Sequence, residues 1–188
     1  YHIDTDRIYV GGVSAGGITV VNAAYLDQES EIPEHLFDYI QENGGLAGNS
    51  GNEGYNSHFH GVINLCGAVG DYNWITEGDI PIVSVHGDED SIVPYGEGLI
   101  TLFGLNMQVY GSYVINETML ALGNTSALYT FVGEGHTPFI NDSNAMDITV
   151  EFTRDFMIDL VCYSEDEIIG DLNNDDVLNV QDVIIMVN

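Results

Sequence analysis

A stretch near the start of the chain decides the fold: Asp6-Arg7-Ile8-Tyr9-Val10-Gly11-Gly12-Val13-Ser14-Ala15-Gly16-Gly17-Ile18-Thr19-Val20-Val21. The apolar residues 8–10 predict a short strand, and the apolar run from Ile18 predicts a buried helix after a glycine-rich turn. Residues 12–16 match the pattern Gly-x-Ser-x-Gly, in which a serine stands at the tip of a sharp strand-to-helix turn. The residues two before and two after that serine are expected to be small, because larger side chains would collide within the turn. The stretch therefore predicts that Ser14 is held out from the end of a sheet.

Such a turn suits nucleophilic chemistry at Ser14. The backbone N–H of Ala15 is expected to be free to donate to a developing oxyanion, with the positive end of the following helix behind it. A plain glycine-rich turn is the alternative interpretation of the same pattern. The strand before the turn and the helix after it favour the nucleophile.

The composition excludes several classes of function. The chain has 188 residues, enough for one domain with a small appendage. Its mean hydropathy is +0.06, and no apolar run is long enough to span a membrane, so membrane insertion is not expected. The sequence has 30 acidic residues against two basic ones, Arg7 and Arg154, which gives a formal net charge of −28. Nucleic acid is excluded as a partner, because its phosphates are contacted through Lys and Arg.

Strands and helices alternate along the rest of the chain. Near-continuous apolar runs predict three more strands, at residues 62–66, 81–86 and 128–132. Apolar residues at helical spacing predict helices at residues 18–26, 113–122 and 145–161. Ser112 is a plausible N-cap and Gly123 a plausible stop for the second of these helices. The alternation predicts an α/β fold with a mostly parallel sheet of about four strands, flanked by helices.

Three reactive side chains come directly after predicted strands, in the order Ser14, Asp90, His136. The carboxyl ends of parallel strands lie at one edge of a sheet, so these side chains can meet although they are far apart in sequence. His136 would take the proton of Ser14 and return it to the leaving group, while Asp90 would orient the imidazole. Asp88 or Glu89 could replace Asp90, and His136 could be a simple turn residue.

Three blocks around these residues resemble the signature blocks of serine α/β-hydrolases: Gly-Val-Ser-Ala-Gly-Gly at 12–17, His-Gly-Asp-Glu-Asp-Ser-Ile-Val-Pro-Tyr at 86–95, and Gly-Glu-Gly-His-Thr-Pro at 133–138. The nearest groups are secreted carboxylesterases, feruloyl and acetyl-xylan esterases, and polyhydroxyalkanoate depolymerases. The resemblance covers residues 1 to about 162 and implies a partial hydrolase domain at 1–164. It implies that Asp90, four residues after the His of the His-Gly block, is the acid. It also implies cleavage of a carboxylic ester through an acyl-enzyme, on polysaccharide-linked esters or polyesters, outside the cell or at its surface.

One part of the family pattern is missing from this sequence. The second oxyanion donor of the family comes from a loop after an earlier strand, often a His-Gly-Gly-Gly block, and no such block occurs here. We therefore expect this chain to be the C-terminal part of a longer esterase and to be inactive or barely active alone. Losing one oxyanion donor typically lowers the rate by about a hundredfold to a thousandfold.

Several other residues allow more than one interpretation. Trp74 falls just past the carboxyl end of the strand at 62–66, where ligands bind in open sheets, so it could line a substrate pocket or belong to the core. Cys66 and Cys162 could form a disulfide or be two separate thiols. His58 and His60 lack surrounding Cys or acidic ligands, which favours ordinary histidines over a metal pair.

The acidic tail at 165–188 forms a separate module. Positions 1, 3, 5 and 12 of a calcium-binding loop in this tail would be occupied by Asp171, Asn173, Asp175 and Asp182. These side chains offer oxygen ligands at the spacing of an EF-hand-like calcium site. The tail resembles the first half of a dockerin type I repeat, although Asp176 stands where the loop normally has glycine. The resemblance implies a cohesin-type or cell-surface partner. The alternative function for the whole chain is therefore a non-catalytic, scaffold-attached module whose working part is the calcium tail. A disordered acidic tail is the other interpretation of this segment, and the regular ligand spacing favours the calcium loop over it.

Overall fold

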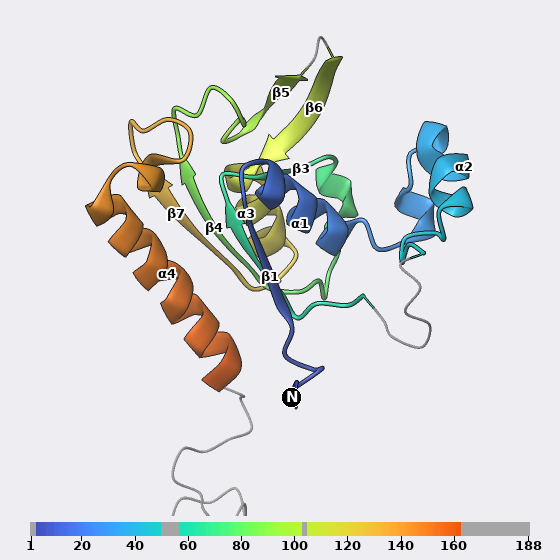
Figure 1. Cartoon of the computed structure of the whole chain (residues 1–188), viewed down its shortest axis with the longest axis horizontal. Helices are drawn as coiled ribbons and strands as arrows, with labels where there is room; N and C mark the ends of the chain where they lie inside the picture. Colours follow the sequence, from blue (N-terminus) through green and yellow to red (C-terminus); the bar gives the residue numbers. More distant parts are fainter. Residues whose placement is uncertain (1–2, 50–56, 103–104, 163–188) are drawn as a thin grey trace, which may run out of the picture. The chain divides into compact units, whose positions relative to one another are not determined.

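The computed structural model describes residues 3–49, 57–102 and 105–162. In this part of the chain the main sheet has four parallel strands in the order β1-β2-β4-β7 (Figure 1). These strands are β1 (Tyr9–Val13), β2 (Gly61–Leu65), β4 (Ile82–Gly87) and β7 (Ser126–Phe131). The predicted α/β fold with a mostly parallel sheet of about four strands is confirmed.

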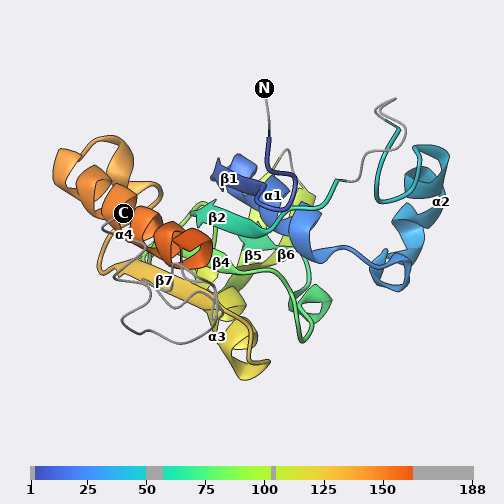
Figure 2. The same ribbon diagram turned by 90° about the horizontal axis from the view of Figure 1, so that it is seen from below.

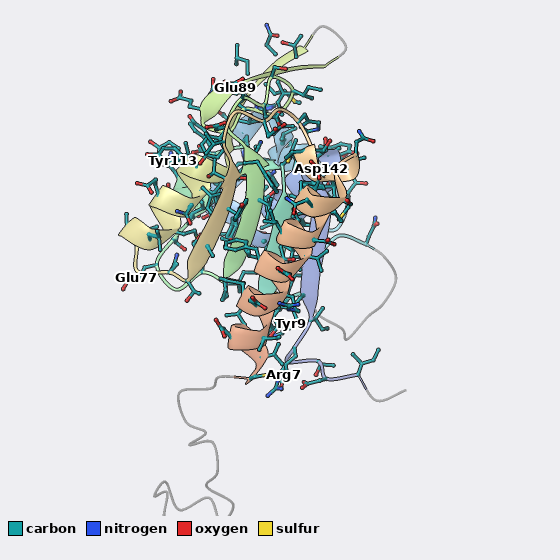
Figure 3. All side chains as sticks on the ribbon, turned by 90° about the vertical axis from the view of Figure 1, so that its left-hand side faces the viewer. Arg7, Tyr9, Glu77, Glu89, Tyr113 and Asp142 are labelled. Carbon is teal, nitrogen blue, oxygen red and sulfur yellow. The ribbon has the colours of Figure 1, made fainter. Side chains whose placement is uncertain are left out.

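The strand register brings the carboxyl ends of all four strands to one edge of the sheet. Gly12 pairs with Asn64, and Asn64 pairs in turn with Ser84. Figure 3 marks this edge by Glu89 and the opposite edge by Tyr9, the first residue of β1. The segments that follow β1, β4 and β7 therefore leave the sheet on the same side.

A second, antiparallel sheet was not predicted. Its strands are β3 (Ala68–Val69), β6 (Leu105–Gly111) and β5 (Glu97–Leu102), in that order. β3 is too short to give a sequence signal, and neither β5 nor β6 forms a continuous apolar run: β5 has glycine and threonine within it, and in β6 apolar residues largely alternate with polar ones. One face of this sheet packs on α1 (Ala15–Tyr25), through a cluster to which α1 contributes Ile18. The cluster joins the small sheet to α1, the helix that begins directly after Ser14.

Helices cover both faces of the main sheet (Figure 2). On one face α1 contacts β1 and β2, and α3 (Ser112–Ala121) contacts β4 and β7. The two helices share a core with the sheet: Val21, Tyr25, Val62, Val69, Ile75, Ile82, Ile115 and Met119. The other face is covered by the first part of α4 (Ser143–Cys162), whose Phe152 packs beside Tyr129 of β7. A further helix, α2 (Glu34–Glu42), follows α1.

The start of α3 differs from expectation. Ser112 is not the N-cap of α3, because Gly111 occupies that position and Ser112 lies in the first turn with its hydroxyl buried. Gly123 does end the helix as expected, with a φ of +79° that glycine adopts without strain. For α4 the cap is Asp142, whose carboxylate accepts the backbone N–H groups of Asn144 and Ala145.

The chain divides into two compact units, Tyr1–Thr153 and Arg154–Asn188. Of the second unit the structure describes residues 154–162, the last turns of α4. The predicted calcium ligands in the tail lie outside the described residues, and the boundary at 164 stays a prediction. None of the described helices is long and apolar enough to cross a membrane.

Candidate active site

Ser14 stands at the turn between β1 and α1 in left-handed backbone geometry, with a φ of +55°. Its N–H donates to the carbonyl of Leu65 at 2.8 Å, which anchors the turn to β2. A methyl group on Gly12 would come within 2.2 Å of the backbone of Gly16, so glycine is required at the first small position. At the second position a Cβ on Gly16 would meet no atom within 4 Å, so glycine itself is not required there. Of these two positions, the one that requires glycine is therefore Gly12, two residues before the serine.

The structure brings Ser14, Asp90 and His136 together, although Ser14 and His136 are 122 residues apart. The Nε2 atom of His136 lies 2.8 Å from the Oγ of Ser14, and its Nδ1 lies 2.6 Å from Oδ2 of Asp90. The side chain of Asp90 is fully buried, whereas that of His136 is 16% exposed. The imidazole therefore lies between a buried carboxylate and a half-buried hydroxyl, which is the arrangement needed to pass a proton from oxygen to nitrogen.

Four donors converge on the Asp90 carboxylate. Its Oδ1 accepts the N–H groups of Ile92 at 2.8 Å and Val93 at 3.0 Å, while Oδ2 faces ring nitrogens of His86 at 3.1 Å and His136 at 2.6 Å. Burial alone would raise the pKa of this carboxyl, but the hydrogen bonds from His86, His136 and the backbone outweigh it and lower the pKa to about 2. Asp90 is therefore ionised at neutral pH despite its burial.

The two other acids considered from the sequence lie elsewhere. The Oδ1 atom of Asp88 accepts the N–H of Gly133 at 2.6 Å, so Asp88 links the loop after β4 to the loop after β7. Glu89 is exposed, and Figure 3 shows its side chain at the carboxyl edge of the sheet. The carboxylate in contact with His136 is that of Asp90.

Two buried residues beside this site were missed as site residues. His86, on β4, is fully buried and contacts Asp90 through Nε2 and Ser112 through Nδ1. The sequence interpretation placed it at the end of an apolar strand and at the start of the His-Gly block, and gave it no role in the site. Cys66 follows β2 with a φ of +54° and is also fully buried.

Cys66 lies under the loop that carries His136. Burial raises the pKa of its thiol to about 11, although backbone N–H groups of Thr137 and Gly87 partly oppose the increase. Thr137, directly after His136, has a φ of +53°, so three residues in or beside the site, Ser14, Cys66 and Thr137, have strained backbone. Both cysteines of the described chain, Cys66 and Cys162, are free thiols, so the disulfide interpretation is not supported.

Among the described residues, one group of side chains has ligand atoms close enough to hold a metal ion: Cys66, Asp90 and His136. Two of these atoms, Asp90 Oδ2 and His136 Nδ1, already face each other at 2.6 Å. An ion there would have to displace that hydrogen bond. His60, considered above as half of a metal pair, accepts the N–H of Ile8 at its Nδ1.

The other predicted residues have the following places. Ala15 begins α1 and is exposed. Trp74 is half-buried, packs against the core shared by α1 and α3, and donates its indole N–H to the carbonyl of Glu31 at 3.1 Å. These contacts give Trp74 a packing role, and its place in a substrate pocket stays a prediction.

The fold is similar to that of known esterases. Esterase 2 of Thermogutta terrifontis in its apo form matches with a TM-score of 0.61 and 18% identity, over 86% of this chain and 59% of the esterase. The same esterase phosphorylated by paraoxon matches with a TM-score of 0.60 and 18% identity, over 85% and 56%. A truncated carbohydrate esterase from gut microbiota matches with a TM-score of 0.50 and 18% identity, over 82% and 61%.

These likenesses establish an α/β-hydrolase-like fold for the chain. The chain spans less than two thirds of the length of each of these esterases. No protein-family model matches the sequence, and no curated protein matches it.

Proposed function

We propose that this chain carries the reacting groups of a serine ester hydrolase. The observation that supports the proposal most directly is the hydrogen-bonded series Ser14 Oγ, His136 Nε2, His136 Nδ1 and Asp90 Oδ2, with distances of 2.8 and 2.6 Å at its two contacts. Its members come from three loops at one edge of an esterase-like sheet. A serine in a strained turn, beside a base held by an ionised buried acid, is the arrangement that acyl transfer requires.

The proposed reaction begins with attack of Ser14 Oγ on the ester carbonyl. His136 accepts the hydroxyl proton at Nε2 while its Nδ1–H keeps donating its hydrogen bond to Asp90. The negative charge of Asp90 stabilises the imidazolium that results. The N–H of Ala15, which has no helical partner at the first position of α1, donates to the oxyanion. Nε2 then protonates the departing alcohol oxygen, leaving an acyl group on Ser14. Water attacks the acyl carbon with His136 as the base, which releases the acid and restores the serine.

The substrate class and location of the enzyme belong to the same proposal. The sequence blocks favour esters linked to polysaccharides, or polyesters, and a secreted or cell-surface protein. The carbohydrate esterase among the structural neighbours is consistent with that class. A second oxyanion donor is proposed to come from polypeptide outside this sequence, so turnover by these 188 residues alone is expected to be weak.

A fluorophosphonate probe tests the proposal without depending on efficient turnover. We expect the probe to form a covalent bond with Ser14, identified by mass spectrometry of the labelled peptide, as paraoxon phosphorylates the Thermogutta esterase. Ser14→Ala should abolish labelling and hydrolysis of p-nitrophenyl acetate, whereas Ser30→Ala, at an exposed serine, should leave both unchanged. Labelling that survives Ser14→Ala would reject the assignment of the nucleophile.

A further inference from the structure

A row of buried polar side chains lies behind Asp90, on the side away from His136. It comprises Asn64 of β2, His86 of β4 and Ser112 of α3, with Ser84 of β4 beside Asn64. All four are completely buried. Polar side chains in such a place persist only when their hydrogen bonds are satisfied, and among the described residues no buried side-chain nitrogen or oxygen lacks a partner.

The orientation of Asn64 is fixed by the backbone. Its Oδ1 accepts the N–H of Gly67 at 2.9 Å, and a backbone N–H can only donate. The amide nitrogen of Asn64 must therefore face the other way, where it donates to Ser84 Oγ at 3.2 Å and to Ser112 Oγ at 3.0 Å. Ser112 thus receives a hydrogen bond and has its own proton to donate.

The tautomer of His86 follows from both of its ends. Its Nε2 lies 3.1 Å from Asp90 Oδ2 and 3.1 Å from the carbonyl of Val93, and both are acceptors, so Nε2 carries a proton. Its Nδ1 lies 2.7 Å from Ser112 Oγ. If Nδ1 also carried a proton, the Ser112 hydroxyl would face two donors, the Asn64 amide and Nδ1 of His86. Its own proton would then have no acceptor. The proton on Nδ1 would also place a second charge in a site without solvent. Neutral His86, protonated at Nε2, satisfies every contact.

We propose that His86 is a positioning residue that acts on the reacting groups through Asp90. Two series of hydrogen bonds then end at Asp90: one runs from Asn64 through Ser112 and His86, and the other from Ser14 through His136. Each series donates in a single direction, so its members strengthen one another. The inference rests on the proposed function, and it adds a residue that touches neither substrate nor Ser14.

His86 and His136 contact the same oxygen of Asp90, Oδ2, so a change at His86 alters the oxygen that orients His136. The donor from His86 adds to the hydrogen bonds that hold Asp90 ionised, and it makes Oδ2 less able to take the Nδ1 proton of His136. Because His86 is neutral, it does so without adding positive charge near the imidazolium that forms during the reaction. Rigid attachment to β2, β4 and α3 also fixes the direction in which Oδ2 points.

Nitrogen-15 NMR of the histidine rings tests the tautomer in the full chain, whether or not the chain hydrolyses esters. We expect one histidine, assigned by its loss in His86→Gln, to be neutral with its proton on Nε2 at neutral pH. An imidazolium signal, or a proton on Nδ1 alone, overturns the proposal. Because this readout needs no turnover, it remains decisive even if Ser14 fails to react with the fluorophosphonate.

A matched pair of serines tests the effect on reactivity. Ser112 and Ser84 both accept from Asn64, but only Ser112 reaches His86. Ser112→Ala should lower the maximal rate of fluorophosphonate labelling several-fold without weakening probe binding, while Ser84→Ala should change it little. His86→Leu should lower the rate by roughly tenfold to a hundredfold, the effect of one hydrogen bond to a charged group. His86→Gln, which keeps an N–H donor, should recover part of the loss.

The outcomes separate the two proposals. Equal effects of Ser112→Ala and Ser84→Ala, with both variants folded as judged by circular dichroism, would refute the role of His86 and leave the nucleophile untouched. No labelling of Ser14 at all would refute the proposed function, and the NMR result would still decide the state of His86. A variant that fails to fold is replaced by its milder partner, Ser112→Ala in place of His86→Leu.

Discussion

Replacing Asp90 by Asn is the sharpest test of the site, because four donors are aimed at this carboxylate. Asparagine has one oxygen and one NH₂ group, so its NH₂ must face donors in either orientation. The backbone N–H groups of Ile92 and Val93 cannot change roles, which forces the NH₂ toward the histidines. His136 then accepts at Nδ1 and carries its proton on Nε2, facing Ser14. It can no longer act as a base, and we expect labelling of Ser14 to fall by about ten-thousandfold, as for this substitution in serine proteases.

The same substitution should also destabilise the fold. The difference between the ordinary pKa of 3.8 and the pKa of about 2 in the folded protein corresponds to about 2 kcal/mol at neutral pH. Because the pKa is lowered by folding, this contribution is present above pH of about 4 and is lost as the pH falls toward 2. Urea unfolding at neutral pH should therefore show a loss of about 2 kcal/mol or more in Asp90→Asn, and the difference from the parent chain should shrink in acid.

Asp88→Asn is the matched control for this experiment. Asp88 is two residues away, on the same loop, and its carboxylate accepts from the backbone of Gly133 rather than from a histidine. We expect a modest loss of stability and nearly normal labelling. If Asp90→Asn keeps its reactivity, or if Asp88→Asn is equally damaging, then Asp90 is not the group that holds His136 in its working tautomer.

Three further predictions concern other parts of the chain. Gly12→Ala places a methyl group 2.2 Å from backbone atoms of α1, so it should distort the serine turn and abolish labelling, measured with the same probe. Asp27→Asn should raise the thermal midpoint slightly at low salt and have no effect at high salt. Burial is the main cause that raises the pKa values of Glu31 and Asp79, and the charge of Asp27 adds to it, so removing that charge relieves a small repulsion; a lower midpoint would contradict this. The tail is predicted to bind Ca²⁺ through residues 171–182, and calorimetry that detects no binding at millimolar Ca²⁺ would reject the calcium loop.

The strands and the serine turn were predictable because their signals are local. A glycine-rich turn between an apolar strand and an apolar helix is read from about fifteen adjacent residues, and the parallel sheet follows from the alternation of such units. The small antiparallel sheet could not be predicted in this way. β3 has two residues, and its pairing with β6 depends on a segment about forty residues further along the chain. The residues alone left Asp90, Asp88 and Glu89 open, and the resemblance to serine hydrolases implied Asp90. The contact of Asp90 with His136 is visible only in the fold, because 46 residues separate the two.

The role of Ser112 illustrates how a correct local rule can lead to a wrong assignment. Serine before an apolar helical run commonly caps the helix, so the sequence placed it at the N-cap of α3. In the structure the chain enters the helix one residue earlier, at Gly111, where a side chain would come within 1.8 Å of the carbonyl oxygen of Pro94. This leaves Ser112 inside the first turn, facing the sheet. Its hydroxyl there meets His86 and Asn64 instead of the helix backbone.

The sequence nevertheless contained a signal for the row behind Asp90. Successive side chains of a strand point to opposite faces, and β4 is buried on both, so its polar residues Ser84 and His86 share one buried face. Asn64 of β2 is the strand partner of Ser84, which extends the same row across the sheet. Polar residues two apart in an otherwise apolar strand need partners within the core, because leaving them unsatisfied costs more than replacing them by valine. The presence of polar side chains at these positions is therefore better explained by their hydrogen bonds to the group that orients His136 than by packing alone.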